Sequence, residues 1–146
     1  MPNEPLPVKQ LLDELDSQWN ASNVTEPELI EVTGANEPIR FNLNRADHIV
    51  GRAGSPALRE EPIGNWTYGN RFYSIELEVH TLNSRQRLYN LMREVRRICH
   101  ARASNLSGFQ RIQFMNFGEL TTEQVNLWSG TVTIELQNYA ITLETT

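Results

Sequence analysis

The 146-residue sequence lacks the residues that disulfides and membrane spans require. Its single cysteine, Cys99, can form no internal disulfide and has no companion for ligating a metal. No run of about 18 or more apolar residues occurs, so we expect no membrane-spanning helix and no membrane partner. The first residues, Met-Pro-Asn-Glu-Pro, lack the basic and apolar regions of a signal peptide, which predicts retention in cytosol-like conditions.

Patterns typical of catalytic sites are also missing. The three histidines, His48, His80 and His100, stand far apart, and none has a metal-ligand spacing. There is no nucleophile elbow and no glycine-rich dinucleotide fingerprint. Glu76 and Glu78 share one strand face and could form an acid/base pair, but solvated or ion-paired carboxylates are the better explanation. We therefore expect no catalytic residues, no metal, no cofactor and no enzymatic activity.

The clearest pattern that is present is a strand passing directly into a long helix. Residues 73–80 alternate between apolar and polar side chains, which predicts a strand with one buried face. Asn83, followed three residues later by Gln86, fits a helix N-cap and its reciprocal partner. Apolar residues then recur at helical spacing, which predicts a central helix over 83–102 that packs on the sheet. These apolar residues are Leu88, Leu91, Met92, Val95, Ile98 and Cys99.

Shorter elements are predicted around this unit. An amphipathic helix is expected over 6–20, a short helix over 118–128, and a connection without periodicity, either a long loop or a β-arm, over 51–70. Further strands are expected at 29–33, 40–44, 47–51, 109–117 and 130–136. Residues 1–146 thus predict a single α+β domain, a mostly antiparallel four- to five-stranded sheet packed by the central and N-terminal helices.

Charge is distributed unevenly along the chain. The whole sequence has 13 basic and 18 acidic residues and a net charge of −5. Residues 1–39 hold eight acids and one base, a net charge of −7, whereas residues 83–111 hold seven arginines and one acid, a net charge of +6. A molecule of this kind can bind a second copy of itself head to tail, the contact from which rings are built.

The positive charge gathers on the outer face of the predicted central helix. At about 100° per residue, Arg85, Arg93, Arg96 and Arg97 fall within about a third of its circumference. A solvated face is one explanation, but like charges at these spacings cost about 0.2–0.5 kcal/mol per pair. We therefore favour a partner surface for this row of arginines.

The predicted subunit interface has two further parts. Acids of the N-terminal helix would face the arginines of the next copy. The connection over 51–70 is longer than the roughly 12–15 residues beyond which structureless loops are usually functional, and it carries aromatic residues that could dock on a neighbour. The candidate interface residues are Arg85, Arg93, Arg96, Arg97, Asp13, Glu14, Asp16, Trp66 and Tyr68.

The order of these segments resembles a known family. The resemblance is carried by a strand, an arginine-bearing helix and a tryptophan before the last strand, in residues 47–50, 73–81, 84–98 and 127–136. In combination they resemble the small neck proteins of tailed viruses of bacteria and archaea, and tail terminators above all. The similarity covers roughly residues 29–139.

This resemblance implies a non-enzymatic structural protein of the virion tail or neck, assembled in the host cytoplasm. Such proteins have an α/β fold and form rings, commonly hexameric, that cap the tail tube and join it to the head-tail connector. The implied partners are other copies of the chain, the tail tube protein and the connector or adaptor proteins. Genomic DNA would pass through the lumen of the ring without sequence-specific binding.

Two alternatives stay open from the sequence. One is another neck component, a head-closure or adaptor protein, or a tail-tube subunit. The other is a nucleic-acid-binding module that contacts phosphates through the arginines between Arg85 and Arg102. The net acidity of the chain and the scarcity of aromatic residues among these arginines weigh against the second alternative.

Overall fold

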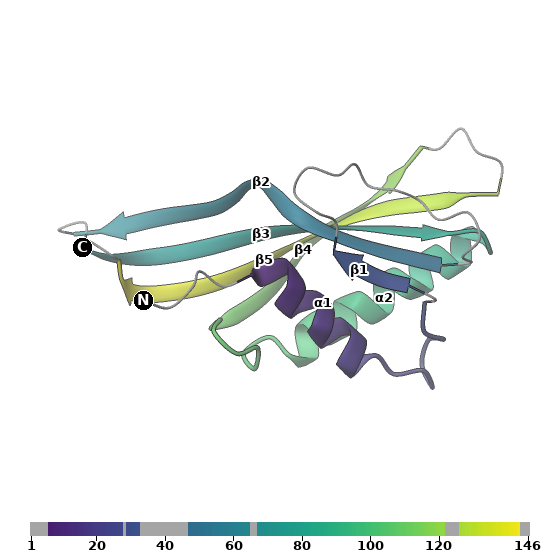
Figure 1. The fold of residues 1–146 in the computed structure, drawn as a ribbon, viewed down its shortest axis with the longest axis horizontal. Helices are drawn as coiled ribbons and strands as arrows, with labels where there is room; N and C mark the ends of the chain where they lie inside the picture. The colour runs from purple at the N-terminus through teal and green to yellow at the C-terminus, as the bar shows by residue number, and fades with distance from the viewer. Residues whose placement is uncertain (1–5, 28, 33–46, 65–66, 122–125, 144–146) are drawn as a thin grey trace.

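The computed structural model describes residues 6–27, 29–32, 47–64, 67–121 and 126–143. They form a five-stranded sheet in the order β1-β2-β3-β5-β4, with two helices on one of its faces (Figure 1). Only β1 and β2 are parallel, and the other pairs are antiparallel. The elements are α1 (Pro7–Gln18), β1 (Leu29–Val32), β2 (Asp47–Ile63), β3 (Tyr68–Thr81), α2 (Arg85–Ala101), β4 (Arg111–Leu120) and β5 (Trp128–Thr142).

The α+β fold predicted from the sequence is confirmed, and so is the core between the sheet and the helices. Ile75, Leu77 and Val79 on one face of β3 are fully buried, as the alternating pattern predicts. Leu91 and Val95 of α2 are fully buried against the sheet. Burying one such side chain contributes about 1.5–3 kcal/mol. The apolar stripe of α1 completes this core with Leu11, Leu12 and Leu15.

The N-cap predicted for α2 is wrong by one residue. The cap is Ser84, whose Oγ accepts a hydrogen bond from the Arg87 amide at 3.1 Å. Asn83 contacts other partners: its side-chain amide donates to Asp47 at 3.3 Å, and its backbone N–H donates to Thr81 Oγ1 at 3.1 Å. Asn83 therefore stabilises the end of β3, and the next residue, Ser84, caps the helix.

The region 51–70 is a β-arm and not a loop. β2 continues to Ile63, turns through Gly64 at a φ of +67°, and pairs with β3 from Tyr68 onward. Residues 54–57 bulge out of the ladder between the pairs Ala53–Ile75 and Leu58–Tyr73. This bulge interrupts the period of two, and beyond it every described β2 side chain is exposed. A sequence pattern that depends on one buried face could not detect this part of the strand.

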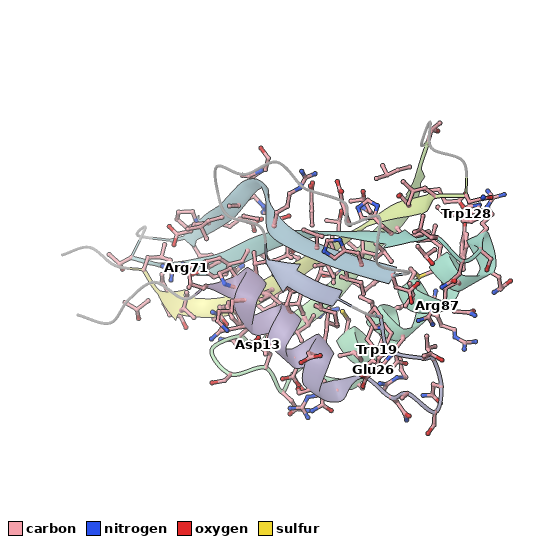
Figure 2. The ribbon with its side chains drawn as sticks, turned by 45° about the vertical axis from the view of Figure 1, so that its right-hand side comes forward. Asp13, Trp19, Glu26, Arg71, Arg87 and Trp128 are labelled. Atoms are coloured by element: carbon pink, nitrogen blue, oxygen red, sulfur yellow. The ribbon has the colours of Figure 1, made fainter. Side chains whose placement is uncertain are left out.

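The β-arm consists of residues 58–63, 68–73 and 137–142, from β2, β3 and β5. Figure 1 shows these strands extending well beyond both helices. On the arm, Arg71 donates to Glu60 at 2.7 Å, and Arg59 lies over the Phe72 ring at 4.2 Å from its centroid. Figure 2 shows Arg71 on the arm and Trp128 at the opposite end of the sheet.

The remaining predictions have mixed outcomes. The strand predicted over 29–33 is present as β1. The short helix over 118–128 is wrong at its start, because Gly118, Glu119 and Leu120 continue β4 and pair with β5. Residues 122–125 and the predicted strand over 40–44 lie outside the described residues. Among the described helices, none is both long and apolar enough to span a membrane.

Candidate subunit interface

Two arginines of α2, Arg87 and Arg97, bind residues of the same chain at the end of α1 and in the connection between α1 and β1. Arg87 donates to Asp47 Oδ2 at 2.8 Å and to the carbonyl oxygen of Thr25 at 2.6 Å. Asp47 is 4% exposed and also accepts from Thr81 Oγ1 at 2.7 Å. Figure 2 shows Glu26 and Arg87 at the same end of the molecule, where this connection meets α2.

The second of these contacts involves Glu94, the one acid among the arginines of α2. Its carboxylate is 1% exposed and accepts two hydrogen bonds from Arg97, each 2.7 Å long. It also accepts from the Asn20 amide at 2.8 Å, and Arg97 donates to the Gln18 carbonyl at 2.9 Å. The hydrogen bonds from Arg97 lower the pKa of Glu94 against the opposing effect of burial. Together Glu94 and Arg97 hold the end of α1 on α2.

Arg85 points toward β4. It donates to both oxygens of Glu119 at 2.7 and 2.6 Å, a bidentate pair on the exposed surface. One turn later, Tyr89 packs edge-on against Phe117 of β4, with ring centroids 5.4 Å apart. This side of α2 therefore lies along the outer strand of the sheet.

Arg93 and Arg96 are the exposed arginines of α2 with no salt bridge to any residue that the structure describes. On α1, Asp16 is exposed, and Asp13 pairs with Lys9 at 2.9 Å on the surface. Glu14 pairs with Arg102 of the same chain at 2.6 Å. The acids and arginines predicted to join two copies are thus partly engaged within one copy.

One aromatic residue of the predicted interface, Tyr68, lies at the end of the β-arm and is 45% exposed. The other, Trp66, lies outside the described residues. Sequence reasoning missed two apolar side chains of the arm, Leu58 and Ile63, which are 43% and 49% exposed. The predicted interface residues that the structure describes therefore fall on three elements: α1, α2 and the arm.

Arg87 and Glu94 were missed as well, although Glu94 carried a signal. A lone acid three residues before Arg97 on an arginine-rich helix is at the spacing of an intrahelical ion pair. Arg87 carried no comparable signal, because its partners are 40 or more residues away along the chain.

One polar cluster has the residue types of a catalytic triad. His80 Nδ1 lies 2.6 Å from Ser129 Oγ, and His80 Nε2 lies 3.2 Å from a Glu78 oxygen. Ser129 is only 2% exposed, so a substrate cannot reach its hydroxyl in this arrangement. Burial raises the pKa of Cys99 to about 12, which keeps that thiol protonated. Within the described residues, no group of three or more His, Cys, Asp or Glu side chains could hold a metal ion.

Comparison with known proteins gives one informative likeness. No protein-family model matches the sequence, and no curated protein matches it. Among the solved structures that match is a chain from a structure described as the virion of a native gene transfer agent particle. The superposition has a TM-score of 0.59 at 10% sequence identity and covers 92% of this chain and 96% of that chain. The two chains therefore share one fold over nearly their whole lengths.

Proposed function

We propose that this chain is a structural virion protein of a tailed virus, a tail terminator whose ring caps the tail tube and joins it to the head-tail connector. The observation that supports the proposal most is the fold shared with a chain of a gene transfer agent virion, since it covers both chains almost completely. The order of segments in the sequence also resembles that of neck proteins of tailed viruses. The shared fold and the sequence resemblance together favour a virion component. The tail-terminator role is the more specific part of the proposal.

The described geometry suits a ring subunit better than an enzyme. The charged side chains that are engaged within the chain fasten α1, α2 and the sheet to one another. Three of the large apolar side chains that stay exposed lie on the β-arm, where Leu58, Ile63 and Tyr68 are each more than two-fifths exposed. Exposed apolar groups on a projecting element mark a protein-protein contact. We propose that the arm contacts a neighbouring subunit or ring and that the protein has no catalytic role.

The nucleic-acid alternative is less favoured by the structure. Arg85, Arg87, Arg97 and Arg102 each bind a carboxylate of the same chain, and such neutralised arginines contribute little to phosphate binding. Another neck component or a tail-tube subunit would share the ring assembly and differ in its partners.

Native mass spectrometry combined with negative-stain imaging tests the proposal. The purified chain should form rings with a central lumen, alone or on addition of the tail tube protein. A protein that stays monomeric under both conditions and shifts on DNA would support the nucleic-acid module instead. Binding to the tail tube end, as against stacking into long tubes, separates a terminator from a tube subunit.

A further inference from the structure

The two helices lie side by side above the sheet in the same order as the strands beneath them. α1 packs on β1 and β2, and α2 packs on β3, β5 and β4. Because β1 and β4 are the two outer strands, the molecule has an α1/β1 side and, opposite to it, an α2/β4 side. The acids of α1 and the arginines of α2 therefore belong to helices on opposite sides of the fold, although some of them pair with each other between the helices.

The α1/β1 side is acidic. Glu14 binds Arg102, so the flank of α1 that carries Glu14 faces α2. At about 100° per residue, Asp13 and Asp16 lie on the flank away from Glu14, and both are exposed. Figure 2 labels Asp13 on this helix. These two carboxylates are therefore turned away from α2, toward the outside of the molecule.

The α2/β4 side is basic. Arg85 and Tyr89 contact Glu119 and Phe117 of β4, which fixes the flank of α2 that lies along the outer strand. Arg96 is two turns beyond Tyr89, so it lies on that same flank. It is exposed and has no salt bridge to any described residue.

The acidic and basic sides also match along the helix axes. Gln18 accepts a hydrogen bond from Arg97, and Glu14 accepts one from Arg102. Asp16 lies between Gln18 and Glu14 in sequence, so it sits level with the last turns of α2. Arg96 is next to Arg97 and thus lies within about one turn of that level. If a second copy is placed beside the first by a translation across the sheet, Asp16 of one copy comes near Arg96 of the other.

The sheet offers matching edges beneath the helices. Within the described residues, β1 and β4 each have a neighbouring strand on one side only. Unpaired edge strands are templates for pairing with another chain, and natural edges are blunted by proline and bulges. β2 beyond β1 carries Pro56, Pro62 and the bulge at 54–57, whereas β4 contains no proline and one bulge, at Met115. The prolines are therefore confined to the arm, and β4 on either side of Met115 is available for an edge contact with β1.

We propose that the α2/β4 side of one subunit binds the α1/β1 side of a second copy of this chain. The contact is heterologous, since two different surfaces meet, and its repetition closes a ring. Arg96 of one copy faces Asp16 of the next, while β4 lies along β1. This proposal rests on the proposed function, and it adds which sides of the subunit meet.

Thiol cross-linking tests this contact directly. The test variant is Asp16→Cys combined with Arg96→Cys in one chain, treated with a short bismaleimide. Cys99 can stay in place because its thiol is fully buried and protonated. We expect a ladder of covalent oligomers that ends at the ring size found by native mass spectrometry. The single variants Asp16→Cys and Arg96→Cys should give no ladder and no dimer, because a heterologous contact never brings two identical positions together.

The outcomes separate this inference from the proposed function. If native mass spectrometry shows rings but the double variant gives no ladder, the sides assigned here are wrong and the ring proposal stands. A cross-linked dimer from the single Arg96→Cys variant would show α2/β4 sides meeting each other, which also overturns the inference. If the chain is monomeric at all concentrations, with and without the tail tube protein, both proposals fail.

Discussion

Arg102 at the end of α2 donates a hydrogen bond of 2.6 Å to Glu14 of α1, and so joins the two helices through residues that are 88 positions apart in the sequence. Opposite charge on the N-terminal region and on the arginine-rich helix is therefore used first to assemble one subunit. A second copy can contact only the charged side chains that stay exposed in the folded subunit. These are chiefly Asp13, Asp16, Arg93 and Arg96. This distinction determines which substitutions test folding and which test assembly.

The core beneath α2 should be sensitive to truncation. Leu91→Ala removes a fully buried side chain and should lower the free energy of unfolding by about 2–5 kcal/mol, because it leaves a cavity. Val95→Ala should destabilise by a smaller amount, since it removes fewer atoms. Thermal or denaturant unfolding measures both. The matched control is Arg93→Ala on the exposed face of the same helix, and equal midpoints for all three variants would place the stripe outside the core.

The fold was predictable from the sequence where one face of an element is buried. The period of two in residues 73–80 and the helical period from Leu88 to Cys99 both arise because one side meets the core and the other does not. The arm has no such contrast, since its β2 segment is exposed on both faces, so its strand character left no trace in the pattern. The Asn83 cap failed because Asp47, distant in sequence, binds that side chain.

Glu94 should make stability depend on pH in acid. Because its pKa in the folded chain is lowered, mainly by hydrogen bonds from Arg97, its contribution to stability is complete above the pKa of an unfolded glutamate, about 4.3. That contribution is lost as the pH falls through the lower folded value. Glu94→Gln should be less stable at neutral pH, by about 1–3 kcal/mol, since it leaves the Arg97 guanidinium without its charged partner. Its unfolding midpoint should also change less between pH 6 and 3 than that of the wild type, and parallel curves would contradict this role.

Shortening the arm should spare folding and impair assembly. Arg59 and Phe72 are opposite one another in the ladder, so residues 60–71 can be replaced by a two-residue Asn-Gly turn. The shortened chain should unfold cooperatively near the wild-type midpoint, because the core lies beneath the helices. Its rings should be weaker or absent by native mass spectrometry. A milder variant, Ile63→Ser with Tyr68→Ser, changes only exposed apolar groups and should act in the same direction. If the shortened chain fails to fold, the arm is part of the core.

Charge reversal should act on assembly through Arg93 and Arg96. Changing both to Glu places like charge against Asp16 of the next copy and should shift rings toward folded monomers. Reversing Asp13 and Asp16 to Arg in the same chain should restore part of the ring population. Arg97→Glu is unsuitable for this purpose, since it would put a second carboxylate beside buried Glu94 and unfold the end of α1. Rings of wild-type size in the Arg93/Arg96 reversal would show that these arginines face solvent or another partner.

The candidate site was only partly accessible to sequence reasoning, and the reason is physical. Helical spacing correctly placed Arg93 and Arg96 on an outer face, because that inference needs only local geometry. It could not separate them from Arg87 and Arg97, whose partners come from the end of α1 and from the connection that follows it. Which charges are left over for a neighbour depends on tertiary contacts that no local pattern contains.

Whether this chain forms the proposed virion ring is decided by native mass spectrometry of the purified wild-type protein, with negative-stain images of the same sample. We expect a closed oligomer of one defined size with a central lumen, alone or once the tail tube protein is added. A monomer under both conditions, across the whole accessible concentration range, would contradict it.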